Sequence, residues 1–262
     1  MGAVVLVKAS IFWMALMGGL GGTFLSSVAH ASPWGQMGGA YVIINRFDQY
    51  WSSAEDRSFK QSNIQIYGEA GLPKKLTVGG KATYTAQHIE RPGFEDHPQG
   101  ISEAEVFLQR RLMKRGRSVL SAKAAYAAPT QISSALVNGV NTERDGAVQL
   151  SGLYGWSTGP IFVGGEGGYR HSFGGDADQM RLNFTLGHKA RNGRLVLVEL
   201  FNTISVTDPA FGGVDYDLVT LSPSIVLPAR GKHKLQLGAT IDLHGRNVDN
   251  GYSAFISFWK ER

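Results

Sequence analysis

Hydrophobic and polar residues alternate along most of this chain. In the segment 62–72, Ile64 and Ile66 alternate with Gln65, and the same rule continues across residues 76–85. A period of two over about ten residues predicts strands longer than the five or six residues that are typical of soluble sheets. Ten residues is about the length that a tilted strand needs to cross a bilayer. The two segments therefore predict a hairpin of membrane-crossing strands.

The alternation recurs to the C-terminus and predicts about twelve strands. They are expected over residues 40–51, 62–72, 76–85, 102–112, 118–128, 147–156, 161–173, 179–190, 195–206, 218–227, 233–244 and 251–259. An even number of long strands, joined alternately by short turns and longer loops, is typical of single-chain bacterial outer-membrane barrels. The sequence predicts an all-β fold, an antiparallel up-and-down transmembrane β-barrel. Within it, Pro223 predicts a bulge.

The connections differ in charge as well as in length. The polar segments 52–61, 88–101 and 129–146 are expected to be loops, and the long loops hold most of the acids, among them Asp215 and Asp217. The short turns carry only basic charges, which suit the phosphates of the inner leaflet. Alternatively, the acids of the long loops form a rim that collects divalent ions or cationic solutes.

The N-terminus has the features of a signal peptide. Lys8 precedes an apolar stretch over residues 11–25, and Ala29-His30-Ala31 forms an A-x-A cleavage site. We expect residues 1–31 to be a signal peptide and residues 32–262 to be one barrel domain; the alternative is an N-terminal membrane anchor. The remaining chain contains no apolar run long enough for a transmembrane helix.

Composition narrows the chemistry that the chain can carry. The sequence contains no cysteine, which excludes disulfides, thiolate metal sites and cysteine nucleophiles. The formal net charge is +5, but the basic residues gather in the short turns, so no nucleic-acid partner is expected. The segment 155–159 matches G-x-S-x-G, yet Pro160 and a further strand follow it where a nucleophile elbow needs a helix.

Neither the histidines nor the glycine-rich segment indicates a cofactor or metal site. His88, His97, His171, His188, His233 and His244 show no metal-ligand spacing. No helix follows the glycine-rich run 164–168, so it is not a phosphate loop; it is expected where strands approach closely. We therefore expect no catalytic residue, no cofactor and no metal.

The charged residues inside the expected strands define a candidate functional surface. A charge that faces lipid at the bilayer midplane costs about 2–4 kcal/mol, so these side chains are expected in the lumen. They are Glu69, Lys81, Glu103, Glu105, Arg111, Lys123, Glu166, Arg170, Arg181, Glu199 and Asp242. Glu69 is expected opposite Gly79, with Lys81 on the diagonal within salt-bridge reach. Two interpretations remain open: a polar conduit that selects solutes by charge, or a paired network that fills a narrow barrel and conducts nothing.

The last strand carries a candidate assembly signal. Tyr252, Ile256, Phe258 and Trp259 are expected to be recognised by the barrel-assembly machinery, although Lys260-Glu261-Arg262 follows the aromatic pair. The alternative is an ordinary closing strand.

One hairpin resembles a known family. The segment 67–78, YGEAGLPKKLTV, resembles the Y-x-E-Y-G-L-T-x-x-L-T hairpin of XagA-like outer-membrane barrels and, more loosely, of barrels associated with aromatic degradation. The segments 103–112 and 118–124 resemble its continuation, whereas Ala70 and Pro73 depart from it. The resemblance implies a barrel in the Gram-negative outer membrane and an association with surface polysaccharide and biofilm. It implies no catalytic residue.

Taken together, these features predict an outer-membrane protein that is not an enzyme. It is expected to be a narrow polar channel or a surface-associated structural component, linked to polysaccharide and biofilm or to passage of small solutes. Its expected partners are outer-membrane lipid, lipopolysaccharide and the barrel-assembly machinery. One alternative is an outer-membrane lipid hydrolase with a Ser–His pair at the rim. Another is a soluble periplasmic barrel that binds a ligand inside, in which the apolar faces would point inward.

Overall fold

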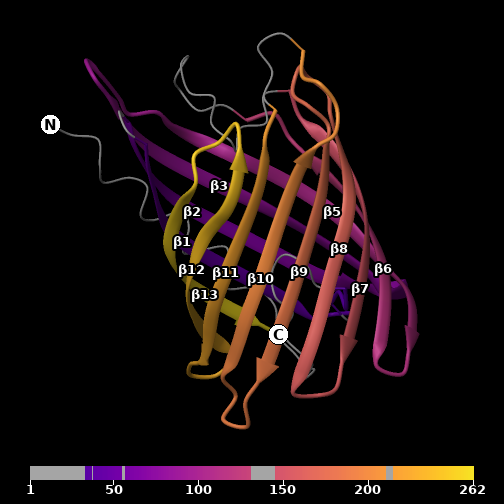
Figure 1. Ribbon diagram of the computed structural model, residues 1–262. Helices are drawn as coiled ribbons and strands as arrows, with labels where there is room; N and C mark the ends of the chain where they lie inside the picture. Colours follow the sequence, from indigo (N-terminus) through magenta and orange to yellow (C-terminus); the bar gives the residue numbers. More distant parts are fainter. Residues whose placement is uncertain (1–32, 37, 55–56, 131–144, 211–214) are drawn as a thin grey trace, which may run out of the picture.

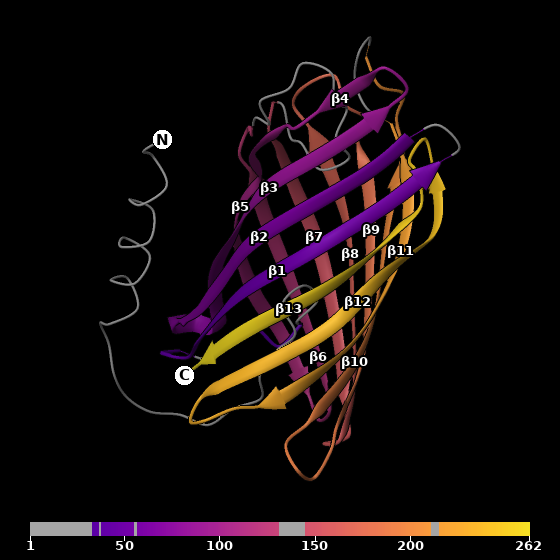
Figure 2. The same ribbon diagram turned by 90° about the vertical axis from the view of Figure 1, so that its left-hand side faces the viewer.

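The wall of the molecule is built from long antiparallel strands that tilt steeply across the barrel (Figures 1 and 2). The computed structural model describes residues 33–36, 38–54, 57–130, 145–210 and 215–262. The expected signal peptide and most of the segment 129–146 lie outside these residues. Among the described residues, no helix is long and apolar enough to cross a membrane.

The strands are close to those expected over most of the chain. Their bounds are β1 Tyr41–Ala54, β2 Arg57–Leu72, β3 Leu76–Arg91, β4 Phe94–Asp96, β5 Gln99–Arg115, β6 Ser118–Ala127, β7 Ala147–Ser157, β8 Ile161–Ser172, β9 Gln179–Lys189, β10 Leu195–Ser205, β11 Asp217–Pro228, β12 His233–Arg246 and β13 Gly251–Glu261. Most have ten residues or more, as a membrane-crossing strand requires.

The strands form one closed sheet. Each long strand pairs antiparallel with its neighbours in sequence, and β1 pairs with both β2 and β13, which closes the wall. β4 pairs only with the end of β3, so twelve strands make up the closed barrel. The predicted fold class is therefore confirmed. Closure leaves the twelve-stranded wall without an open edge, which is the condition for a sheet to span a membrane.

Two segments that were expected to be loops are largely strand. The expectation for 52–61 was wrong because β1 and β2 pair as far as Ala54 and Arg57. The expectation for 88–101 was wrong in the same way, since β3 runs to Arg91 and pairs there with β4. Both segments carry polar residues on both faces, so they show no hydrophobic alternation although their backbones pair. These hairpins extend the barrel at the end that carries the long loops, the long-loop end (Figure 2).

The expected bulge in β11 lies a few residues from Pro223. The register of β11 against β12 shifts between Val219 and Thr220. The pairing with β12 runs through Leu221 and resumes at Ser224, so the ladder is interrupted at Pro223 without a further shift. This interruption follows from the missing N–H of proline.

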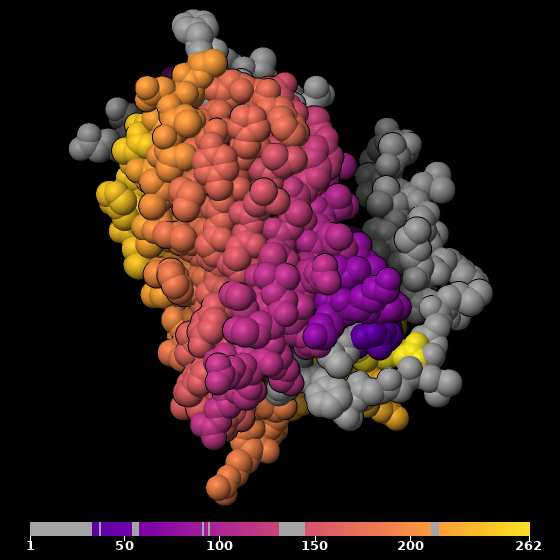
Figure 3. Space-filling view, turned by 90° about the vertical axis from the view of Figure 1, so that its right-hand side faces the viewer, coloured from indigo at the N-terminus to yellow at the C-terminus, as the bar shows by residue number. Residues whose placement is uncertain are grey.

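The two faces of the wall differ in polarity. Phe184 is 51% exposed on the outer face, while its neighbour Thr185 is 3% exposed on the inner face. The same contrast recurs around the barrel, where outer Leu150 alternates with inner Gln149 and Ser151. Figure 3 shows part of the continuous outer surface that these strands present. A barrel with an apolar exterior and a polar interior has the arrangement of a membrane-spanning barrel.

Candidate functional site

The inner face of the barrel collects the charged residues that the alternation singled out. Four of them are almost fully buried: Glu69, Glu166, Arg170 and Glu199. The other seven are half-buried, and none is exposed: Lys81, Glu103, Glu105, Arg111, Lys123, Arg181 and Asp242. Because all eleven lie on or near the inner face, their contacts determine the character of the interior.

Three ion pairs link one side of the interior. Lys81 Nζ on β3 lies 2.6 Å from Glu103 Oε1 on β5. Lys123 Nζ on β6 lies 2.5 Å from Glu166 Oε1 on β8, a carboxylate that also accepts a hydrogen bond from Gln149. The third pair, between Arg170 and Glu105, measures 3.5 Å. Each pair joins an acid and a base, so this side of the wall carries little net charge.

Glu69 lies opposite Gly79, as expected, but the contacts that the structure shows for it are to other residues. Its carboxylate accepts hydrogen bonds from the Tyr67 hydroxyl and from the side-chain amide of Gln36, each 2.7 Å long. Lys81 forms its ion pair with Glu103, on the strand at its other side. Glu69 thus contacts an aromatic hydroxyl and the N-terminal segment, and its expected pairing with Lys81 across the hairpin stays a prediction.

The alternation did not identify two charged residues on β1. Arg46 lies 3.6 Å from Asp48, its guanidinium lies over the ring of Phe255 at 3.7 Å, and Asp48 accepts a hydrogen bond from Asn63. Arg46 also interacts electrostatically with Glu199, whose Oε1 has no hydrogen-bond partner among the described residues. Val42 and Ile44 are the first residues on the inner face of β1, and both are apolar. The apolar start of this face hid the charged residues that follow on the same face, Arg46 and Asp48.

The three remaining residues of the expected set lie toward the ends of their strands. Asp242 accepts hydrogen bonds from the Tyr50 hydroxyl at 2.8 Å and from Thr220 at 2.7 Å. Arg181 donates two hydrogen bonds to the side chain of Gln179. Arg111 lies near the end of β5, toward the short-turn end of the barrel, which is the end that carries the turns at residues 73–75, 116–117 and 158–160.

A short piece of chain lies inside the barrel at the short-turn end. Ser121 donates a 2.5 Å hydrogen bond to the carbonyl of Pro33, and the Gln36 backbone N–H donates to Thr77. Trp34 packs edge-on against Phe162, with ring centroids 5.8 Å apart. A Cβ atom added at Gly155 would lie 2.3 Å from Pro33, so this glycine leaves room for the segment. Residues 33–36, which we call the N-terminal segment, carry no pattern in the sequence that indicates this role.

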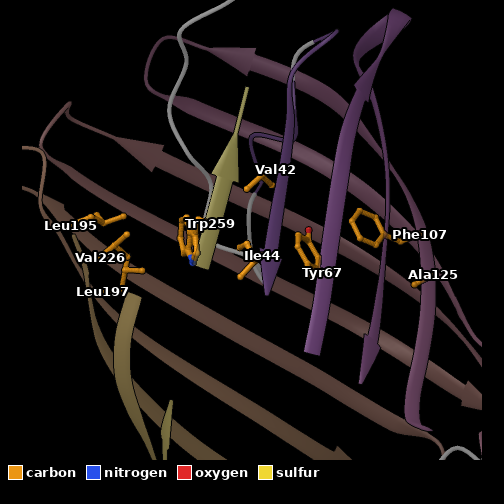
Figure 4. Packing of buried hydrophobic residues seen from close by; sticks show 9 residues of the cluster. All are labelled: Val42, Ile44, Tyr67, Phe107, Ala125, Leu195, Leu197, Val226 and Trp259. Carbon is orange, nitrogen blue, oxygen red and sulfur yellow. The ribbon is translucent and has the colours of Figure 1, made fainter. Parts of the chain in front are cut away.

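Apolar side chains narrow the same end of the interior. Figure 4 shows nine of them: Leu195, Leu197 and Val226 on one side, Tyr67, Phe107 and Ala125 on the other, and Val42, Ile44 and Trp259 between. Phe162, the partner of Trp34, packs against this cluster. The interior thus changes from apolar contacts and the N-terminal segment at the short-turn end to charged and polar side chains farther along.

The acids of the long-loop rim do not all remain open to ions. The Arg246 guanidinium donates hydrogen bonds to Asp215 and Asp217, with the closest contacts 2.6 Å and 2.7 Å long. These hydrogen bonds hold the pKa of both carboxyls below the usual range of aspartate. The two carboxylates, which the alternative role of the acidic rim would offer to divalent ions, therefore already bind a cation of the protein itself.

Among the residues that the structure describes, one group of metal-ligand residue types comes together. His88, Glu95 and His97 lie close to one another, although their spacing in the sequence matches no metal-ligand motif. A signal was present: His88 and His97 are equidistant from the Pro92-Gly93 turn, so a tight hairpin brings them opposite each other.

The segment that matches G-x-S-x-G is a turn between two strands. Ser157 ends β7, its hydroxyl accepts a hydrogen bond from the Gly159 backbone N–H, and β8 begins at Ile161. The helix that a nucleophile elbow requires does not follow.

Solved structures with the same architecture include the COG4313 outer membrane channel from Pseudomonas putida F1. It is 11% identical, with a TM-score of 0.68 over 90% of this chain and 100% of that chain. The translocator domain of the autotransporter NalP from Neisseria meningitidis has a TM-score of 0.55 at 11% identity, over 85% and 88% of the two chains. The β domain of the Bordetella autotransporter BrkA has a TM-score of 0.52 at 14% identity, over 84% and 98%.

No protein-family model and no curated protein matches the chain in sequence. At these identities, the likeness to the three structures establishes the fold alone. The chain has the fold of the outer-membrane β-barrels.

Proposed function

We propose that this protein is an outer-membrane channel for small polar solutes, constricted at its periplasmic end by its own N-terminal segment. Short turns face the periplasm in barrels of this kind, so Pro33–Gln36 would lie on the periplasmic side. The likeness to a protein described as an outer membrane channel supports this function.

The observation that carries the proposal is the way in which the N-terminal segment is held. It hydrogen-bonds to the side chains of Ser121, Glu69 and Thr77, the last through both the backbone N–H and the carbonyl of Gln36. A segment held by a few hydrogen bonds, each worth about 0.5–1.5 kcal/mol, can leave the interior without disrupting the strand pairing of the wall. The constriction would then be a removable part of a polar passage.

The interior suggests which solutes would pass. Acids and bases are paired in three places along the inner face, so neither sign of charge dominates. A passage of this kind favours small neutral or zwitterionic polar molecules over ions of one sign. The apolar cluster beside the N-terminal segment would exclude large hydrated solutes.

Single-channel recording in planar bilayers tests the proposal. The purified protein should give small conductance steps, and a variant that lacks residues 33–38 should give steps severalfold larger. Neutralising one pair with Lys81→Gln and Glu103→Gln should change the step size or the ion selectivity. A protein that stays silent both with and without residues 33–38 would contradict the channel and favour the filled, non-conducting barrel.

Localisation and assembly belong to the same proposal. Residues 1–31 would be cleaved as a signal peptide, and the barrel-assembly machinery would recognise β13 through Tyr252, Ile256 and Phe258. Tyr252 and Phe258 are exposed on the outer face, whereas the Trp259 side chain is buried and donates a hydrogen bond to Gln236. Removing the last eight residues should leave the chain in the periplasm. Normal insertion of that variant would contradict the assembly signal.

A surface-associated role is the second candidate, carried by the hairpin 67–78 and its resemblance to XagA-like barrels. The aromatic-degradation barrels are the looser relatives that this resemblance suggests. A strain without the protein should then form less biofilm, and a non-conducting variant should restore it. If only conducting variants restore biofilm, the channel accounts for both effects. We propose no catalytic activity.

A further inference from the structure

The hairpin of β3 and β4 projects at the long-loop end and gathers four residues with metal-ligand side chains on one face. Ile89 pairs with Asp96, Glu90 with Glu95, and Arg91 with Phe94, around the turn at residues 92–93. The same register resumes where Ala86 pairs with Gln99, so His88 and His97 lie opposite each other on the rung between. Glu90 and Glu95 occupy the next rung on the same face, because alternate residues of a strand share a face.

Three of these side chains are in contact. The Nδ1 atoms of His88 and His97 lie 3.1 Å apart. Glu95 Oε1 lies 3.2 Å from Nε2 of His97 and 3.7 Å from Nδ1 of His88. His88 is half-buried, whereas Glu95 and His97 are exposed, so an ion can reach the group from solvent.

The two shortest contacts use different ring nitrogens of His97, but one ligand atom from each of the three residues lies within 4.8 Å of the others, which is near the spacing of ligands around one metal ion. A tetrahedral zinc ion with bonds of about 2.0–2.1 Å holds its ligand atoms about 3.3 Å from one another. Two imidazoles with a carboxylate are a ligand set that Zn²⁺ and related transition metals prefer to Ca²⁺ or Mg²⁺, which take oxygen ligands. The hairpin also holds the ligands in place, because His88 and Glu95 lie on the paired strands β3 and β4 and His97 directly follows β4.

We propose that His88, Glu95 and His97 form a binding site for Zn²⁺ or a similar divalent transition metal at the extracellular tip of the barrel. Glu90, which accepts a hydrogen bond from Ser58, adds negative charge beside the site. Asp96 adds another carboxylate on the neighbouring position. Lys60 on β2 lies opposite His88 and is a basic group that opposes a bound cation.

The site is independent of the channel, because all three ligands lie outside the interior. Tyr84 lies on the same outer face of β3 as His88 and is 43% exposed. His88 is four residues farther toward the tip, and strands rise about 3.3 Å per residue, so the site lies beyond the apolar band. A bound ion would tie the two strands of the hairpin together at the cell surface.

Zinc titration of the full barrel tests this inference. The protein is purified in detergent without a polyhistidine tag, stripped of metal, and titrated with Zn²⁺ by calorimetry and by equilibrium dialysis. We expect one tightly held Zn²⁺ per chain. Changes to groups that merely orient a ligand cost about 10–100-fold in affinity, so His88→Ala or His97→Ala should cost at least as much.

His233→Ala is the matched control, because His233 is an exposed histidine at the short-turn end. The His233→Ala variant should bind Zn²⁺ with the same affinity as the unaltered protein. Heat-modifiable migration on gels verifies that each variant is folded. Binding that is absent from the unaltered protein, or that survives in the double variant His88→Ala/His97→Ala, would overturn the inference and leave only a hydrogen-bonded histidine pair.

Discussion

Lys123 and Glu166 form an ion pair across an intervening strand of the barrel wall. Lys123 Nζ on β6 lies 2.5 Å from Glu166 Oε1 on β8, and β7 runs between them. On β7, Ser151 lies opposite Lys123, and Gly168 on β8 leaves room for the Ser151 side chain, because a Cβ atom there would lie 2.3 Å from its hydroxyl. The pair therefore braces three strands from the inside.

Replacing Glu166 with Gln should destabilise the barrel and alter its selectivity. The change keeps the shape of the side chain but leaves the Lys123 ammonium without its carboxylate in a buried position. Breaking one partner of a buried ion pair costs about 3–5 kcal/mol. The free energy of unfolding in urea, followed by tryptophan fluorescence in lipid vesicles, should fall by about that amount, and reversal potentials should shift toward anions.

Asp208→Asn is the control for the loss of one negative charge, because Asp208 is exposed outside the strands. This variant should change neither the free energy of unfolding nor the reversal potential. If Glu166→Gln behaved like this control, the pair would contribute neither to stability nor to selectivity.

Replacing Gly155 with Ala should displace the N-terminal segment while leaving the wall intact. The added methyl would meet Pro33 and Trp34 inside the barrel. Gly152→Ala on the same strand is the matched control, since a Cβ atom there meets nothing within 4 Å. Bilayer recordings should show larger conductance steps for Gly155→Ala alone. Equal steps from the two variants would mean that the segment does not limit the passage.

The contact of Arg246 with Asp215 and Asp217 should be lost only in acid. Their pKa values are lowered in the folded protein, so the contact is fully present above the ordinary aspartate pKa of about 3.9. It weakens as pH falls through the lowered values. Hydrogen-exchange protection near residues 215–217, corrected for intrinsic rates, should be constant from about pH 7 to pH 5 and fall below about pH 4.

Arg246→Gln supplies the comparison for that titration. It should reduce protection near residues 215–217 at neutral pH and remove most of the acid dependence. A loop that keeps its acid dependence in the variant would place the titration elsewhere in the protein.

Hydrophobic alternation predicted the strands wherever lipid covers one face. β9 is typical, because outer Phe184 and Leu186 alternate with inner Thr185 and Gly187. The signal vanishes where both faces meet water, and the extended tips of the β1–β2 and β3–β4 hairpins were therefore expected to be loops. The backbone pairing there depends on hydrogen bonds and on the turn, which hydropathy does not report.

The interior could be predicted only in part. Charged residues such as Glu166 were expected on the inner face from the cost of placing a charge in lipid. Leu195, Leu197 and Trp259 are buried inside the short-turn end, so an apolar side chain does not always mark the lipid face. The N-terminal segment and the group of His88, Glu95 and His97 depend on contacts between distant positions, which a strand-by-strand pattern does not contain.

The most direct test of the account uses two adjacent residues on β9. Because the chain has no cysteine, Thr185→Cys on the inner face and Phe184→Cys on the outer face each introduce a single reactive thiol. A charged, membrane-impermeant thiol reagent is added during bilayer recording. We predict that it reduces the conductance of Thr185→Cys and leaves that of Phe184→Cys unchanged; the same response from both, or block of Phe184→Cys alone, would contradict a polar passage through this barrel.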